Sequence, residues 1–137
     1  MDIKHLSKII VEFYERLSSW EDSVVRDSGL TTAQAHTIEI VGHDGPIKMK
    51  DLAQKIGVTT GTLTVAVDRL EKKNLLVRKP HATDRRAYLI DLTEDGHIYF
   101  KQHHNFHIEM TQKIVAGLTD EERILFADIM EKVLKRI

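Results

Sequence analysis

The chain lacks cysteine altogether, has only two prolines among its 137 residues, and contains no long apolar run. Without cysteine, disulfides, thiolate zinc fingers, iron–sulfur ligation and a thiol redox switch are all excluded. The first residues, MDIK, lack the basic and apolar regions of a signal peptide, and no apolar run is long enough to span a bilayer. We therefore expect a cytoplasmic protein.

The chain also has almost no net charge, because 20 basic residues face 21 acidic ones. This neutrality hides an uneven distribution. Residues 1–30 and 93–137 each carry a net charge of −2, whereas residues 31–92 carry +3. The basic excess is densest between Arg69 and Arg86, where seven basic residues accompany two acidic ones. Because DNA binding depends on where charges lie, a neutral chain with a basic centre remains compatible with it.

Apolar periodicity predicts a mainly α-helical fold with one short β-hairpin. Helices are expected from the cap Asp2 to the stop at Gly29, and at about residues 32–41, 48–56, 60–73, 93–115 and 120–137. The second is expected to end at the breaker run 42–46, and the fourth at a left-handed Asn74. Thr93 and Thr119 are predicted N-caps of the last two helices. Alternation with a period of two predicts strands at residues 76–79 and 88–92.

The two helices on either side of Gly57 are typical of a helix-turn-helix, and the hairpin after them completes a winged helix. The second helix of such a pair fits the major groove of DNA, and the wing tip reaches the adjacent minor groove. Threonine hydroxyls can contact phosphates or base edges, although helix capping alone also accounts for them. Asp84 can orient an arginine by ion pairing. The predicted DNA-binding residues are Thr59, Thr60, Thr62, Thr64, Arg69, Asp84, Arg85 and Arg86.

Two runs resemble the MarR family of bacterial transcriptional regulators: DRLEKKNLL at residues 68–76 and DRRAYLIDLT at residues 84–93. The resemblance covers nearly the whole chain, and the Asp-x-Arg pattern before an apolar strand and Leu-Thr is its most specific part. It implies a regulator that binds double-stranded operator DNA, with Arg86 in the minor groove held by Asp84. Asn74 stands where the family usually has glycine.

The resemblance also implies a homodimer built from a single domain, residues 1–137. Within it, residues 31–92 form the winged helix DNA-binding part, and residues 1–30 and 93–137 form the dimerisation helices. The apolar content of the first helix and the last two agrees, because it exceeds what a monomer of this size buries easily. A palindromic operator with half-sites about 34–36 Å apart follows from dimer symmetry.

Histidine is abundant, with eight residues in the chain. His103 and His107 lie at i and i+4 on the fifth predicted helix and therefore share one face, with His104 as a possible substitute. This spacing suits a metal ion, and zinc without thiolate takes four nitrogen or oxygen ligands. A pair of this kind by itself is more often solvent-facing or hydrogen-bonded. His81, near the wing tip, can contact a phosphate.

These histidines are similar to those of a zinc-sensing branch of the MarR family. That branch has a histidine on the second helix, a His-x-x-x-His pair on the fifth and a glutamate late in the first. The resemblance implies zinc as the cofactor, with metal ligands Glu21, His36, His103 and His107, and with Asp22 or Glu39 as alternatives to Glu21. Zinc would then modulate DNA affinity by favouring one spacing of the recognition helices. The branch's second site uses cysteine and is not expected here.

Three alternatives are weighed against the zinc-regulated reading. A MarR-type regulator can instead respond to a small aromatic or phenolic ligand, in a cleft lined by Trp20, His36 and Arg16. A metal-binding dimeric interaction module without DNA binding leaves the wing arginines unexplained. An enzyme is not expected, because the His-Glu-x-x-His motif of metalloproteases needs glutamate where this chain has His104.

Overall fold

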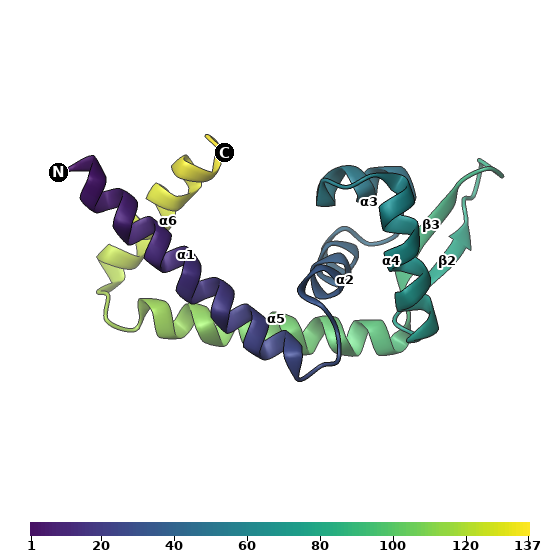
Figure 1. Ribbon diagram of the computed structural model, residues 1–137, viewed down its shortest axis with the longest axis horizontal. Helices are drawn as coiled ribbons and strands as arrows, with labels where there is room; N and C mark the ends of the chain where they lie inside the picture. The colour runs from purple at the N-terminus through teal and green to yellow at the C-terminus, as the bar shows by residue number, and fades with distance from the viewer. The chain divides into compact units, whose positions relative to one another are not determined.

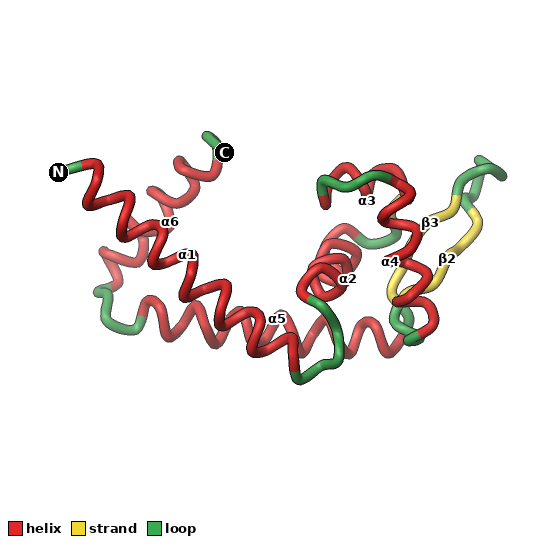
Figure 2. The backbone as a smooth tube through the Cα atoms, viewed as in Figure 1, coloured by secondary structure: helices red, strands yellow, loops and turns green.

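The computed structural model describes residues 1–137, which divide into two compact units, Met1–His103 and His104–Ile137. The fold is mainly α-helical with one small antiparallel sheet, which confirms the predicted winged helix class (Figures 1 and 2). The elements in chain order are α1 (Ile3–Arg26), α2 (Thr32–Asp44), β1 (Ile47–Lys48), α3 (Met49–Ile56), α4 (Thr60–Lys72), β2 (Leu76–Pro80), β3 (Tyr88–Leu92), α5 (Glu94–Val115) and α6 (Asp120–Leu134).

Several helix ends lie where the sequence predicts them, because short polar side chains satisfy the free N–H groups of the first turn. The Asp2 side chain accepts a hydrogen bond from the Lys4 backbone N–H at the start of α1. Thr119 and Glu122 form a complete capping box on α6. Asn74 follows α4 with a positive φ of 59°, as expected for the residue that ends this helix.

Helix α2 is longer than predicted, because it continues through Gly42 to Asp44 and ends at Gly45, whose φ is 70°. The ring of Phe100 packs directly against Gly42, in the space that a Cβ atom there would fill. A glycine in a helix usually weakens it, but here it allows an aromatic ring to approach the backbone closely. The break expected at Gly42 was therefore wrong by one helical turn.

A third strand, β1, was not predicted. Its two residues pair antiparallel with β3, so the sheet has the order β1-β3-β2. Ile47 lies opposite Ile90, and both are buried. Two residues are too few to produce a detectable alternation, so only the pairing with β3 defines this strand.

The apolar core of the first unit holds the winged helix together. Its largest fully buried side chains come from α2, α3, α4, β3 and the end of α1: Ile38, Leu52, Leu63, Leu70, Ile90, Val25, Val41 and Val67. Three of them, Leu63, Val67 and Leu70, lie on one face of α4. Because this face is anchored in the core, the opposite face of α4 is left exposed.

The second unit, residues 104–137, contains no buried residue. Helix α6 exposes a series of large apolar side chains: Ile124, Leu125, Phe126, Ile129, Val133 and Leu134. Exposed apolar surface of this extent marks an interaction site. No helix of the chain is both long and apolar enough to cross a membrane.

Candidate DNA-binding surface and metal site

The first turn of α4 presents the predicted threonines. The Thr59 hydroxyl accepts a hydrogen bond from the Thr62 backbone N–H at 3.1 Å, so Thr59 is the N-cap of this helix. The Thr64 hydroxyl donates to the Thr60 carbonyl oxygen at 2.7 Å. Thr59, Thr60 and Thr62 are nevertheless exposed. The capping bonds therefore position these side chains on the open face of α4, and they leave hydroxyl acceptor and donor capacity for DNA.

A groove runs between α4 and the wing, on the same side as these threonines. The side chains that line it include residues of β1, α3, α4 and the β2–β3 hairpin: Lys48, Lys50, Thr60, Thr64, Arg78, Asp84, Arg86 and Tyr88. Lys48 and Lys50 are exposed and were not among the predicted DNA-binding residues. Their position at the start of the first helix of the helix-turn-helix is a sequence feature from which they could have been predicted.

Some basic side chains of the central region form ion pairs with carboxylates of the protein itself. Arg78 of β2 forms ion pairs with Asp68 and Glu71 of α4, the second at 2.8 Å. Lys79 pairs with Asp91 across the hairpin at 2.9 Å. These pairs connect the hairpin to α4 and close its two strands, so they serve the geometry of the reading surface rather than DNA itself.

The remaining predicted arginines are available to DNA. Arg69, Arg85 and Arg86 are exposed, and their guanidinium groups make no ion pair in the structure. Asp84 contacts Arg86 differently from the expected ion pair, since its carboxylate Oδ1 accepts from the Arg86 backbone N–H at 3.0 Å. The aspartate thus fixes the backbone of the wing tip and leaves the guanidinium free to enter a groove.

This arrangement agrees with what the chain is similar to. Residues 30–88 match the family model described as MarR family. The transcriptional repressor MdtR of Bacillus subtilis (strain 168) is 30% identical over 105 residues, which cover 77% of this chain and 68% of MdtR. The chain belongs to the MarR family. As a member it is a DNA-binding transcriptional regulator and not an enzyme.

Solved MarR-type structures share its fold. The structure of Streptococcus pneumoniae FabT in complex with DNA matches with a TM-score of 0.90 and 23% identity, covering 98% of this chain and 96% of FabT. The structure of NadR in complex with 4-hydroxyphenylacetate matches with a TM-score of 0.76 and 23% identity, covering 93% of this chain and 91% of NadR. At these identities the likeness concerns the fold alone.

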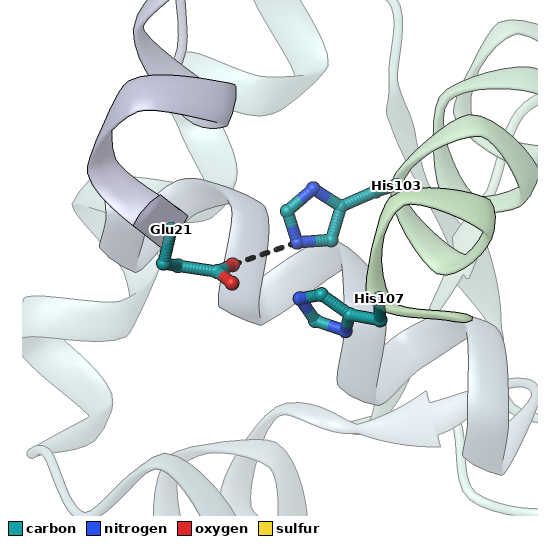
Figure 3. A group of neighbouring side chains, drawn as sticks. All are labelled: Glu21, His103 and His107. Atoms are coloured by element: carbon teal, nitrogen blue, oxygen red, sulfur yellow. Dashed lines mark hydrogen bonds and ion pairs between the residues drawn. The ribbon is translucent and has the colours of Figure 1, made fainter. Parts of the chain in front are cut away.

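A second feature of this MarR family protein is the surroundings of His103, a histidine of α5 that is only 2% exposed. Its Nε2 atom lies 2.9 Å from Oε1 of Glu21 on α1 (Figure 3) and 3.7 Å from Oε1 of Glu39 on α2. The Tyr99 ring stacks on the imidazole with centroids 5.8 Å apart. Burial raises the pKa of the Tyr99 phenol, and the negative charges of Glu21 and Glu39 add to that increase.

Glu39 is the unusual member of these surroundings. It is 8% exposed, and its Oε1 atom is buried without a hydrogen-bond partner. Its other oxygen, Oε2, lies 3.2 Å from Nε2 of His43, one turn later on α2. A buried carboxylate oxygen without a hydrogen bond is costly, and the nearest positively charged or donor group that pairs with this oxygen is the His103 ring at 3.7 Å.

Three of the four predicted metal ligands are grouped. Glu21, His103 and His107 each offer a ligand atom, and these atoms lie within 4.8 Å of one another (Figure 3). His107 follows His103 by one turn of the continuous helix α5. His36, by contrast, is exposed on α2 and does not join this group. Glu39, three residues later on the same helix, is the α2 residue that contacts His103.

Proposed function

We propose that this MarR family regulator binds its operator as a homodimer and that a divalent metal ion, zinc, modulates its affinity for DNA. The observation that carries the metal part is the group formed by Glu21, His103 and His107, beside the buried Glu39 oxygen that accepts no hydrogen bond. Imidazole and carboxylate are ligands that zinc accepts in the absence of thiolate.

Glu21, His103 and His107 supply three ligands, so a site with four ligands needs one more, from α2. Glu39 is better placed for this than His36, because its carboxylate already lies 3.7 Å from His103 Nε2 whereas the His36 side chain is exposed. A cation there satisfies the orphaned Glu39 oxygen and offsets the negative charge of two neighbouring carboxylates. We therefore propose Glu39 as the fourth ligand beside Glu21, His103 and His107, and leave His36 outside the site. Glu39 also lies in a second group of possible ligands, with His43 and His104.

The chemistry that zinc supplies at this site is a bridge between helices. Its ligands come from α1, α2 and α5, and α2 belongs to the core of the winged helix. Binding that requires all three helices together favours the conformations in which α2 is held against the other two. Zinc binds the unprotonated imidazole, so protons compete with the metal and zinc affinity is expected to fall as the pH is lowered.

The test of the metal site is zinc binding by untagged protein with substituted ligands. His103→Ala and His107→Ala are expected to weaken zinc affinity by at least about tenfold and to abolish any zinc-dependent change in DNA affinity, because each removes a ligand. His97→Ala is the matched control, an exposed histidine on the same helix α5. Unaltered zinc content and unaltered zinc-dependent DNA binding in both ligand variants would contradict the proposal.

The homodimer is supported by the apolar surfaces of each unit. Helix α1 buries only Val25 and exposes Ile9, Ile10 and Phe13, and α6 buries nothing. The partner proposed for these surfaces is a second copy of the chain. The two recognition helices of the dimer then contact half-sites about 34–36 Å apart.

The dimer can be tested by placing charge on α6. The double variant Leu125→Glu/Ile129→Glu is expected to convert a species of twice 15.7 kDa into one of 15.7 kDa in light scattering, with at least about tenfold weaker DNA binding. Lys132→Glu introduces the same charge at an exposed polar position of α6 and is expected to remain dimeric. A monomeric wild type, or a dimeric double variant, would contradict the assignment.

A small aromatic effector is the second candidate, favoured by the likeness to NadR, whose structure holds 4-hydroxyphenylacetate. A groove on the first unit is lined by Tyr14, Leu17, Ser18, Glu21, Asp22 and Thr32. Its two carboxylates disfavour an aromatic acid, and Arg16 is already paired with Glu12. Titration of the protein–DNA complex with 4-hydroxyphenylacetate and, separately, with zinc distinguishes the two effectors. Family membership removes the third possibility, an interaction module without DNA binding.

A further inference from the structure

The wing tip is organised around the ring of His81, the first residue after β2. Its Nδ1 atom accepts a hydrogen bond from the Asp84 backbone N–H at 3.0 Å and a longer one from the Thr83 backbone N–H at 3.3 Å. The loop is closed at its base by the His81 backbone N–H, which donates to the Ala87 carbonyl oxygen at 3.2 Å. The imidazole therefore faces its own loop.

These contacts can be made by only one form of the ring. These bonds require an Nδ1 atom without a proton, because only an unprotonated ring nitrogen can accept from backbone N–H groups. The bonds run to the residues two and three positions later, which is the pattern by which Asn and Asp side chains stabilise turns. A doubly protonated imidazolium has no acceptor and cannot make them.

His81 is linked to the DNA-binding arginine through Asp84. The Asp84 backbone N–H donates to His81, and the Asp84 carboxylate accepts from the Arg86 backbone N–H at 3.0 Å. The Ala87 backbone N–H donates to the Asp84 carbonyl oxygen, which completes the turn that carries Arg85 and Arg86. The position of Arg86 thus depends on a short series of bonds that starts at the ring of His81.

We propose that His81 is a positioning residue for DNA binding: its unprotonated Nδ1 orders the wing tip, and protonation of the ring releases the tip and weakens the complex with DNA. This role is independent of the metal site, since His81 lies outside the group around His103. It depends on the DNA binding that the family establishes and on the predicted contact of Arg86 with DNA.

The charged groups around the ring allow this role to be distinguished from a simple phosphate contact. Asp84, Arg85 and Arg86 share the loop, and Lys79 of the adjoining strand is paired with Asp91. A histidine that touches a phosphate binds DNA more tightly when it is protonated, because it gains a positive charge. A histidine that orders the loop as an acceptor has the opposite pH dependence. The sign of the effect therefore identifies the role.

The experiment compares wild type, His81→Asn and His81→Leu as full-length proteins. The Asn side chain places an amide oxygen where Nδ1 lies, so it retains the acceptor and does not titrate, whereas Leu removes the acceptor. The probe is a duplex enriched by the wild type from random-sequence DNA at pH 8. Affinity is measured between about pH 5.5 and 8, the range in which imidazole changes charge. The other seven histidines are common to all three proteins, so ratios between them isolate His81.

At pH 8 we expect His81→Asn to bind within about twofold of wild type and His81→Leu to bind about three- to tenfold more weakly, which corresponds to one lost hydrogen bond. At pH 5.5 we expect wild type to lose about three- to tenfold relative to His81→Asn. Amide resonances of Thr83, Asp84 and Arg86 in the free wild-type protein are expected to titrate together with the ring, and not in His81→Asn. The proposal would be overturned if His81→Leu bound DNA as tightly as wild type at pH 8. It would also be overturned if the DNA affinity of wild type rose relative to that of His81→Asn at low pH.

Discussion

Arg86→Ala is expected to weaken binding to the enriched duplex by about tenfold or more, with the fold intact. The Arg86 side chain is exposed at the tip of the wing and makes no ion pair inside the protein, so its charge is available to the narrow, strongly negative minor groove. Loss of one such contact costs about 1–3 kcal/mol. Because Asp84 holds the backbone and not the guanidinium, removing the side chain leaves the bond that shapes the wing tip in place.

The salt dependence separates a direct contact from an indirect effect. One phosphate-neutralising charge fewer is expected to reduce the slope of log affinity against log salt by about 1. The matched control is Arg136→Ala, which removes an exposed arginine beyond the end of α6 and is expected to leave both affinity and slope unchanged. Equal affinity of Arg86→Ala and wild type at two salt concentrations would refute the role of this residue.

Gly96→Ala is expected to lower the free energy of unfolding by about 1–3 kcal/mol, which is the usual cost of forcing extra volume into a packed site. Gly96 is buried in the first turn of α5, and a Cβ atom there would overlap the backbone carbonyl of Leu75. That carbonyl already accepts a hydrogen bond from the Thr93 backbone N–H at 3.1 Å. The clash is with backbone, so relief requires α5 to shift away from the start of β2.

Denaturant unfolding of Gly96→Ala beside Gly61→Ala provides the comparison. Gly61 is also in the first turn of a helix, α4, but nothing lies closer than 3.9 Å to the Cβ atom that alanine would add. Alanine there is expected to leave stability unchanged or to raise it by up to about 1 kcal/mol, since glycine is the poorer helix former. Glycine-to-alanine substitution is therefore expected to lower the free energy of unfolding at Gly96 and to leave it unchanged or raise it at Gly61. A Gly96→Ala variant as stable as Gly61→Ala would show that the contact with Leu75 does not constrain the fold.

The elements that the sequence predicts correctly are those whose signals are local. Caps at Asp2 and Thr119, the left-handed Asn74 and the alternating strands of the wing are all consequences of chemistry within a few residues. The two errors come from distant partners. Helix α2 extends past Gly42 because Phe100 packs there, and β1 exists because β3 pairs with it. Neither contact is visible in the neighbouring sequence.

The functional residues divide in the same way. The exposure of the wing arginines agrees with their pattern, and their role in DNA binding stays a prediction. The position of Lys48 and Lys50 beside Arg86 could not be predicted, because the groove that they share is a tertiary feature. His103 lies beside Glu21, the predicted carboxylate, but the contact from α2 comes from Glu39 and not from His36. Which residue of a helix reaches a neighbour depends on the rotation of that helix, and spacing along the chain does not specify it.

The two ion pairs of Arg78 have a consequence for how operators can vary. They join the hairpin to α4, so we expect the recognition helix and the wing to keep one spacing when they contact DNA. The number of base pairs between the predicted major-groove contacts of α4 and the predicted minor-groove contact of Arg86 is then expected to be the same in every operator. We therefore expect each half-site of the proposed dimer to have a constant internal length, and operators to differ in base identity and in the interval between the two half-sites.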